Sequence, residues 1–172
     1  MDTKTQVETQ VETWMRGPLA GVNPLIAPVL FTFQQVIEDL NRHTEGLTTE
    51  QVWARPHGLT SLGFHIRHLG GAVERLPVYL AGGDLQERQL ADLAMEAEPG
   101  ESIDELLSEL QRRLHEAEEV IRLIEPEMLA EPRTVGRMRL PTTVIGLLVH
   151  MAEHSQRHLG QAISAGKLSA VY

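Results

Sequence analysis

Apolar residues recur at three- and four-residue spacings in four stretches of the chain, which is the period of an amphipathic helix. The stretches run roughly from Asn23 to Thr44, from Ser61 to Leu80, from Ser102 to Pro126 and from Pro141 to about Ala165. No segment shows a convincing alternation of β-branched residues, the pattern typical of strands. The pattern therefore predicts an all-α fold, a four-helix bundle.

Residues with capping chemistry mark the expected helix ends. Asn23 can cap the first helix, with Pro24 in its first turn. Ser102 is followed three residues later by Glu105, the capping-box pattern, at the start of the third helix. Gly166 is the expected end of the fourth helix, because glycine readily adopts the left-handed conformation that ends helices.

The links between the four helices are long for a simple up-and-down bundle. Each has room for an extra helical turn or for a rim over a pocket: 45–60, 81–101 and 125–141. The stretch "TTEQVWAR" (48–55) is typical of a short helix. The stretch "TVGRMRLPTT" (134–143) contains Gly and Pro and is expected to be a loop.

Length and composition set the expected organisation. The 172 residues are 42% hydrophobic, enough for a single domain with a real core over 1–172. Residues 1–20 are expected to be a loose or short-helical N-terminal extension. No apolar run approaches the length of a membrane span, and the N-terminus lacks the plan of a signal peptide. We therefore expect a cytoplasmic protein that does not bind membranes.

Charge and cysteine content narrow the expected chemistry. The formal net charge is −9 and Lys and Arg form no stripe, so we expect no nucleic-acid partner. The chain has no cysteine, which excludes disulfides, thiolate metal sites and cysteine nucleophiles. Its 8 histidines are a high number for this length, and they are the main lead to function.

Three of these histidines occur at four-residue intervals in "HMAEHSQRHLGQ" (150–161). With a turn of roughly 100° per residue, His158 falls about 60° from the apolar centre of this helix, His154 about 100° and His150 about 140°. His158 is thus expected to point inward, His154 to lie at the margin and His150 to face away. Since residues four apart are neighbours on a helix, the His154–His158 pair can meet a single ion.

A third ligand must come from elsewhere, and "SLGFHIRHLGG" in the second helix offers two histidines. His65 lies nearer the apolar centre of that helix than His68 does, so the geometry mildly favours His65. Burying several imidazoles without partners would be costly, and a shared divalent ion would satisfy them. The remaining histidines, His43, His57 and His115, fall at helix ends or on a polar face and are expected to be solvated.

Other metal sites fit less well. His150 to His154 matches the H-x-x-E-H pattern of inverted zinc proteases, but only 18 residues follow His154, too few for the further carboxylate ligand. A di-iron site is disfavoured because strong inward carboxylates are missing. A bundle without metal, in which the histidines titrate between about pH 7 and 5, is the remaining alternative.

In this order and separation, "SLGFHIRHLGG" and "PTTVIGLLVHMAEHSQRHLGQ" resemble the DinB-like (DinB/YfiT) metalloprotein superfamily, over roughly 24–165. The resemblance implies a bundle with long crossing connections and a three-histidine divalent-metal site. Carried over by motif, the ligands are His68, His154 and His158. His65 is kept as a pocket residue or substitute ligand, and His150 as a pocket or outer residue.

Characterised relatives include thiol-dependent S-transferases and maleylpyruvate isomerase-like enzymes, and dimers are common. The resemblance therefore implies a metal-dependent small-molecule enzyme, a thiol S-transferase or a related hydrolase or isomerase, that is a homodimer. Zinc or nickel is the expected cofactor, and a low-molecular-weight thiol is a candidate substrate. The alternative is a metal-stabilised bundle without catalysis, acting as a binding or stress-associated protein.

Neighbouring polar residues suggest supporting roles. Three neutral histidines leave a coordination position open, as in catalytic metal sites. Glu153 is a candidate acceptor for an imidazole N–H, and Gln161 could form hydrogen bonds within the pocket. Arg67 and Arg157 are candidates for binding an acidic substrate.

Overall fold

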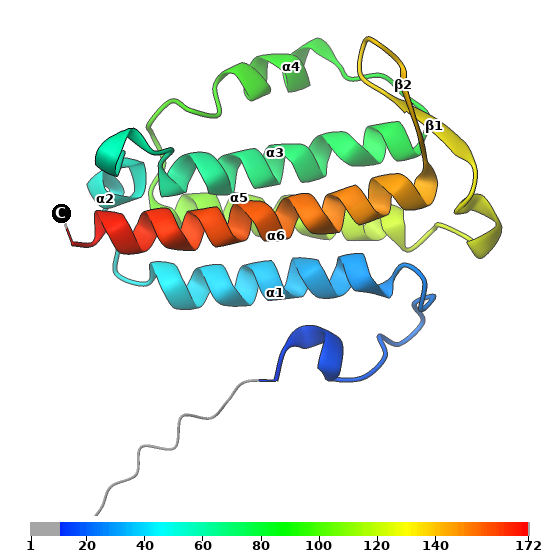
Figure 1. The fold of residues 1–172 in the computed structure, drawn as a ribbon, viewed down its shortest axis with the longest axis horizontal. Coiled ribbons are helices and arrows are strands. Elements are labelled where there is room, and N and C mark those ends of the chain that lie inside the picture. The colour runs from blue at the N-terminus through cyan, green and yellow to red at the C-terminus, as the bar shows by residue number, and fades with distance from the viewer. Residues whose placement is uncertain (1–10, 172) are drawn as a thin grey trace, which may run out of the picture.

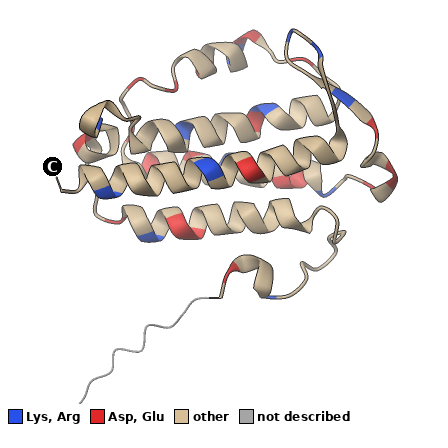
Figure 2. Cartoon of the chain, viewed as in Figure 1, with Lys and Arg blue, Asp and Glu red and all other residues tan. Residues whose placement is uncertain are grey.

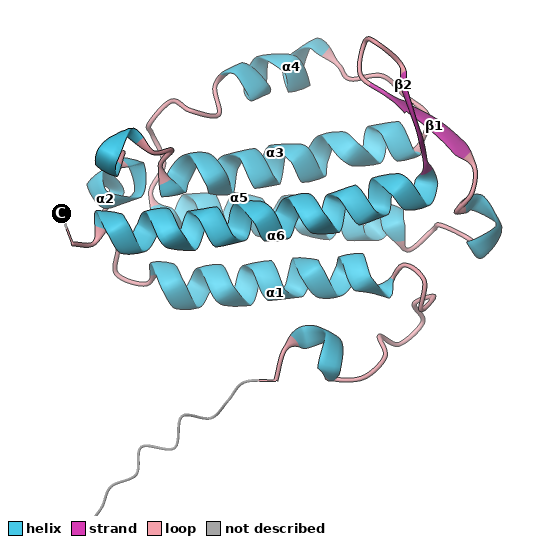
Figure 3. Ribbon diagram, in the orientation of Figure 1, coloured by secondary structure: helices cyan, strands magenta, loops and turns pink. Residues whose placement is uncertain are grey.

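Four long helices lie side by side and form the body of the structure, a computed structural model that describes residues 11–171 (Figure 1). The α-helices are α1 (Ala27–Thr44), α2 (Thr49–Trp53), α3 (Leu62–Leu80), α4 (Glu87–Ala94), α5 (Ile103–Ile121) and α6 (Val144–Ser169). Helix α3 packs against α5 and α6, and α1 packs against the same two helices. The short α2 and α4 lie in the links before and after α3, as Figure 3 shows.

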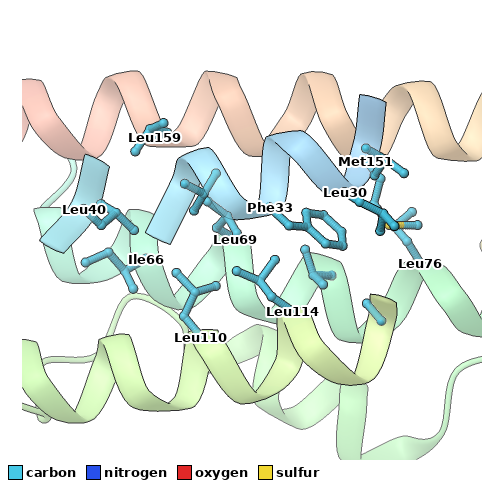
Figure 4. Packing of buried hydrophobic residues seen from close by; sticks show 14 of the residues in the cluster. Leu30, Phe33, Leu40, Ile66, Leu69, Leu76, Leu110, Leu114, Met151 and Leu159 are labelled. Atoms are coloured by element: carbon cyan, nitrogen blue, oxygen red, sulfur yellow. The ribbon is translucent and has the colours of Figure 1, made fainter. Parts of the chain in front are cut away.

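The apolar stripes of the long helices meet in one core. Figure 4 shows side chains from all four helices converging on it. Its largest fully buried members include Leu30, Leu40, Ile66, Leu69, Leu110, Ile121 and Met151. The helical period read from the sequence therefore marks the faces that pack together.

The helix ends follow the expected capping chemistry in part. Ser102 and Glu105 form the predicted capping box at α5. Asn23 does cap the turn that leads into the first helix, since its Oδ1 accepts a hydrogen bond from the Leu25 amide at 2.9 Å. The expected start was wrong, however, because α1 itself begins at Ala27. Leu25, an apolar residue within the first predicted helix, lies before α1 and is 59% exposed.

The expected end of the fourth helix was also wrong. Helix α6 continues past Gly166 to Ser169, and Gly166 is buried inside it. A Cβ there would lie 3.5 Å from a Leu62 methyl and 3.6 Å from a Leu47 methyl. These are ordinary van der Waals distances, so Gly166 is a packed position within the helix rather than a left-handed turn that ends it.

The stretch expected to be a loop before α6 is a small antiparallel hairpin. Strands β1 (Pro132–Val135) and β2 (Leu140–Thr143) pair in a register that sets Pro132 opposite Thr143 and Val135 opposite Leu140. Gly136, with φ of +69°, supplies the left-handed conformation that the turn needs. Prolines are tolerated because both strands of a two-stranded ribbon are edge strands.

The remaining links contain short helical turns. Helix α2 confirms the expected helix in "TTEQVWAR", and 3₁₀ turns occur at Thr13–Met15, Pro56–Gly58 and Pro126–Met128. The Thr13 hydroxyl donates a hydrogen bond to the Phe31 carbonyl at 2.8 Å, which attaches the N-terminal turn to α1. Residues 1–10 of the expected N-terminal extension lie outside the described residues.

Charged residues of both signs are spread along the helices and links (Figure 2). Several pair along one helix, such as Arg112 with Glu109 and Glu116 on α5. Within 11–171, no helix combines the length and the apolar character needed to cross a membrane. The described chain is thus mostly helical, with one two-stranded sheet.

Candidate metal centre

Helices α3 and α6 bring three histidines together. One ring nitrogen from each of His68, His154 and His158 lies within 4.8 Å of the other two. His68 Nε2 is 3.1 Å from His154 Nε2. The ring centroid of His158 lies 4.5 Å from that of His68 and 4.4 Å from that of His154. This group has the donor set and the spacing that could hold a metal ion.

The two α6 histidines differ in burial in the opposite order to the one expected. His154 is buried, with 9% of its surface exposed, whereas His158 is only partly buried. The prediction measured angles from the centre of the apolar residues of this helix. Helix α6 also buries polar residues, among them His154, against α3. These polar residues shift the centre of the buried face toward His154. His150 faces solvent, as expected, with its ring centroid 5.4 Å from that of His154.

A fourth imidazole lies next to the group. His65 is buried, and its Nδ1 is 3.1 Å from the Nδ1 of His158. The expectation that His65 lies deeper than His68 is confirmed, since His65 is buried and His68 only partly buried. Although it is more deeply buried, His65 is not a member of the three-histidine group. It contacts His158 through Nδ1, and His68 is the third member of the group.

Phe64 holds the two α3 rings from one side. Its ring stacks on His68, with centroids 5.3 Å apart and planes 10° apart. It also meets His65 edge-on at 5.2 Å. Such aromatic contacts restrict the rotation of both imidazoles.

A buried carboxylate contacts the group from the link between α4 and α5. Glu96 is 4% exposed, and its Oε2 lies 2.6 Å from His68 Nδ1. Its Oε1 accepts a hydrogen bond from Arg75 Nη1 at 2.8 Å. The expectation that inward carboxylates are missing was therefore wrong for this position. Glu96 lies in a polar link without periodicity, so the sequence pattern gave no signal for its burial.

The acidic and polar residues expected to support the site lie elsewhere. The Glu153 carboxylate is exposed and pairs with Arg157, and Gln161 is exposed too. Glu153 comes within 3.7 Å of His150 rather than meeting an inward imidazole. Arg67 donates to the Met95 carbonyl at 2.8 Å and lies over the Trp53 ring, 4.4 Å from its centroid. It thus holds the α4–α5 link against α3.

Burial keeps His154 and His158 neutral near pH 7. Desolvation, together with charge repulsion from the neighbouring imidazoles, lowers the pKa of His154 to about 3. The same causes lower the pKa of His158 and of His65 to about 4 each. Neutral imidazoles retain a lone pair, which is the form that binds metal ions.

A cavity of about 350 Å³ lies on the other side of α3, between that helix, the α4–α5 link and α5. Its apolar floor includes Ile66, Leu106 and Leu110, and Arg67 and Arg113 are among its charged lining residues. Glu96 lines this cavity and also contacts His68, so it is the point where cavity and histidine group meet.

Comparison with protein families identifies the chain. The family model of the DinB superfamily matches residues 32–162, which include the histidines of both α3 and α6. The match covers most of the chain, and the protein belongs to this superfamily, as the sequence resemblance predicted. A search of curated proteins found no match.

Proposed function

We propose that this DinB-superfamily protein binds one divalent metal ion through His68, His154 and His158 and uses it in small-molecule chemistry. The observation that carries the proposal is the convergence of three imidazole nitrogens within 4.8 Å of one another. We further propose that residues 1–172 form one domain in which the four long helices make a four-helix bundle with long crossing connections.

The spacing of the nitrogens fits a metal ion. Two imidazole nitrogens that each lie about 2.0–2.1 Å from one ion stand about 2.8–3.4 Å apart, for octahedral to tetrahedral angles. The His68 and His154 Nε2 atoms are 3.1 Å apart. The lowered pKa values of His154 and His158 favour the neutral, metal-binding form at physiological pH.

The surroundings of the rings support the same assignment. A ligating histidine usually engages its second ring nitrogen in a hydrogen bond that fixes its tautomer and orientation. His68 meets Glu96 through Nδ1, and His158 meets His65 through Nδ1. In each ring Nε2 is therefore the nitrogen left for the ion.

Three protein ligands leave a coordination position open, which is the pattern of a catalytic site. Zinc or nickel suits a set of imidazole ligands. Such an ion would lower the pKa of a water or thiol bound at the open position. The proposed activity is a thiol S-transferase or a related hydrolase or isomerase reaction. Since the chain has no cysteine, the thiol would come from a small molecule.

Elemental analysis of purified protein tests the metal site. We expect about one equivalent of zinc or nickel per chain in the wild type and loss of the metal in His154→Ala and His158→Ala. His115→Ala, at an exposed position on α5, is the matched control and keeps its metal. Full metal content in both α6 variants would refute the ligand assignment.

A second experiment separates an enzyme from a metal-stabilised binding protein. Metal-loaded and chelator-treated samples are compared for turnover of small thiols with electrophiles. Turnover that requires both the ion and His158 supports the enzyme. A protein that binds the metal tightly but turns over no thiol–electrophile pair is the non-catalytic bundle instead. The homodimer and the cytoplasmic location stay predictions.

A further inference from the structure

A buried ion pair contacts the histidine group from outside the two helices that carry it. Glu96 lies in the α4–α5 link, and its carboxylate spans Arg75 and His68, both on α3. We propose that Glu96 is a positioning residue of the metal centre, which fixes the tautomer and the direction of the His68 ring. The proposal rests on the metal site proposed above.

The hydrogen bonds determine which nitrogen of His68 carries the proton. A carboxylate accepts hydrogen bonds and an arginine only donates them. Glu96 Oε2, 2.6 Å from His68 Nδ1, therefore accepts the Nδ1–H. In neutral His68 the lone pair then lies on Nε2. Nε2 is the atom that faces His154, so the lone pair points into the group.

Helix α3 provides a place for the carboxylate. Gly71 lies one turn before Arg75, and a Cβ at position 71 would collide with Glu96 Oε1 and lie 2.6 Å from Arg75 Nη1. The glycine thus leaves the space that the ion pair occupies. Arg75 is also buried, so its positive charge compensates the carboxylate charge of Glu96 at a place that water does not solvate.

The backbone of the link is held on both sides of Glu96. Arg67 donates hydrogen bonds to the carbonyls of Met95 and Glu98. The carboxylate is therefore delivered from a segment that is itself tied to α3. Phe64 stacks on the His68 ring. Together these contacts leave His68 little freedom to turn, which reduces the entropy lost when a ligand is bound.

The first measurement is the affinity for Co²⁺, used as a spectroscopic probe of the site and measured in competition with a chelator. Removing an outer hydrogen-bond partner of a ligating histidine typically lowers metal affinity about 10–100-fold. We expect a loss at the upper end of that range for Glu96→Ala. Glu96→Gln keeps an acceptor for Nδ1–H without the charge, so its loss should be smaller. The control is Glu98→Gln, the same change at an exposed position of the same link, with affinity unchanged.

Gly71→Ala is a second variant that retains Glu96 and favours helix formation. We expect it to lower Co²⁺ affinity because the added methyl group displaces the carboxylate.

The second measurement is the tautomer of His68 in metal-free protein, from long-range ¹H–¹⁵N correlation spectra. We expect the Nδ1–H form in the wild type and a shift toward Nε2–H in Glu96→Ala. A merely structural glutamate would lower thermal stability without changing tautomer or affinity.

The outcomes separate the two proposals. If the wild type binds Co²⁺ and both Glu96→Ala and Gly71→Ala bind it equally well, the role of Glu96 is refuted and the metal site stands. An Nε2–H tautomer of His68 in the wild type also refutes the role. If the wild type binds no Co²⁺, Zn²⁺ or Ni²⁺, the metal site itself is refuted, and the positioning role with it.

Discussion

His68 on α3 and His154 on α6 face one another through their Nε2 atoms, 3.1 Å apart and 86 positions apart in the chain. A cation between them would join two helices that otherwise pack only through side-chain contacts. Because unfolding would separate the ligands, binding of the ion should stabilise the folded state.

The first prediction is therefore a gain in thermal stability when metal-free protein is loaded. At a free ion concentration of 100 times Kd, the free energy of unfolding should rise by about 2.7 kcal/mol. For a chain of this size that corresponds to a rise in Tm of about 5–10 °C. Differential scanning calorimetry of chelator-treated and Zn²⁺-loaded samples measures it.

The control for this gain is a histidine near the group but outside it. His150→Ala, at an exposed position one turn before His154, should show the same increase in Tm as the wild type. His158→Ala should show little or none. Equal increases in both variants would mean that the ion binds elsewhere on the protein.

The second prediction concerns the stability of the metal-free protein in acid. Burial lowers the pKa of His154 to about 3 and that of His65 to about 4 in the folded state, whereas a histidine in an unfolded chain has a pKa of about 6.5. Between about pH 6.5 and 4 the unfolded chain binds more protons than the folded one, so the free energy of unfolding falls as the pH falls. Above about pH 7 these groups contribute no pH dependence. Urea unfolding measured at intervals from pH 7.5 to 4.5 checks this.

A pair of glutamine variants isolates the histidine contribution. His154→Gln removes one of the buried titrating rings and should flatten the decline in stability between pH 6.5 and 4. His115→Gln changes an exposed ring on α5 and should leave the decline as it is in the wild type. A wild-type protein equally stable at pH 7.5 and 5 would contradict the prediction.

The third prediction concerns the start of α6, the helix that carries two of the three histidines. The Thr143 hydroxyl accepts a hydrogen bond from the Gly146 amide at 3.1 Å, which satisfies one free donor of the first turn. Thr143→Ala should lower the free energy of unfolding by about 1 kcal/mol. Thr143→Ser keeps the acceptor and should lower it much less, as measured by urea unfolding. A similar loss in both variants would show that the methyl group matters rather than the cap.

Much of this architecture could be predicted because the signals were local. The period of the apolar residues located the long helices, and the capping box at Ser102 located the start of α5. The four-residue spacing of His154 and His158 placed both rings on one side of α6. Errors arose where distant contacts decide, as at Gly166, which is buried inside α6 against leucines from other segments.

The surroundings of the histidines could not be predicted for the same reason. Glu96 is flanked in the sequence by exposed link residues, and its burial depends on the space beside Gly71 on α3. The choice between His65 and His68 also depends on how α3 is turned relative to α6. Hydrophobic periodicity predicts only how deeply a residue is buried. The more deeply buried His65 contacts His158 but is not a member of the three-histidine group.

The last prediction uses two helical glycines that differ in their surroundings. A Cβ at Gly63 of α3 would lie 2.8–2.9 Å from ring carbons of Trp53, whose indole N–H donates to the Glu101 carbonyl. Gly63→Ala should therefore destabilise the protein by about 1–3 kcal/mol, because the ring cannot retreat without losing that bond. Gly160→Ala on α6 meets no atom within 4 Å and should instead stabilise it by about 1 kcal/mol through helix propensity. Urea unfolding measures both, and a stabilising Gly63→Ala would show that Trp53 does not pack against α3 as described.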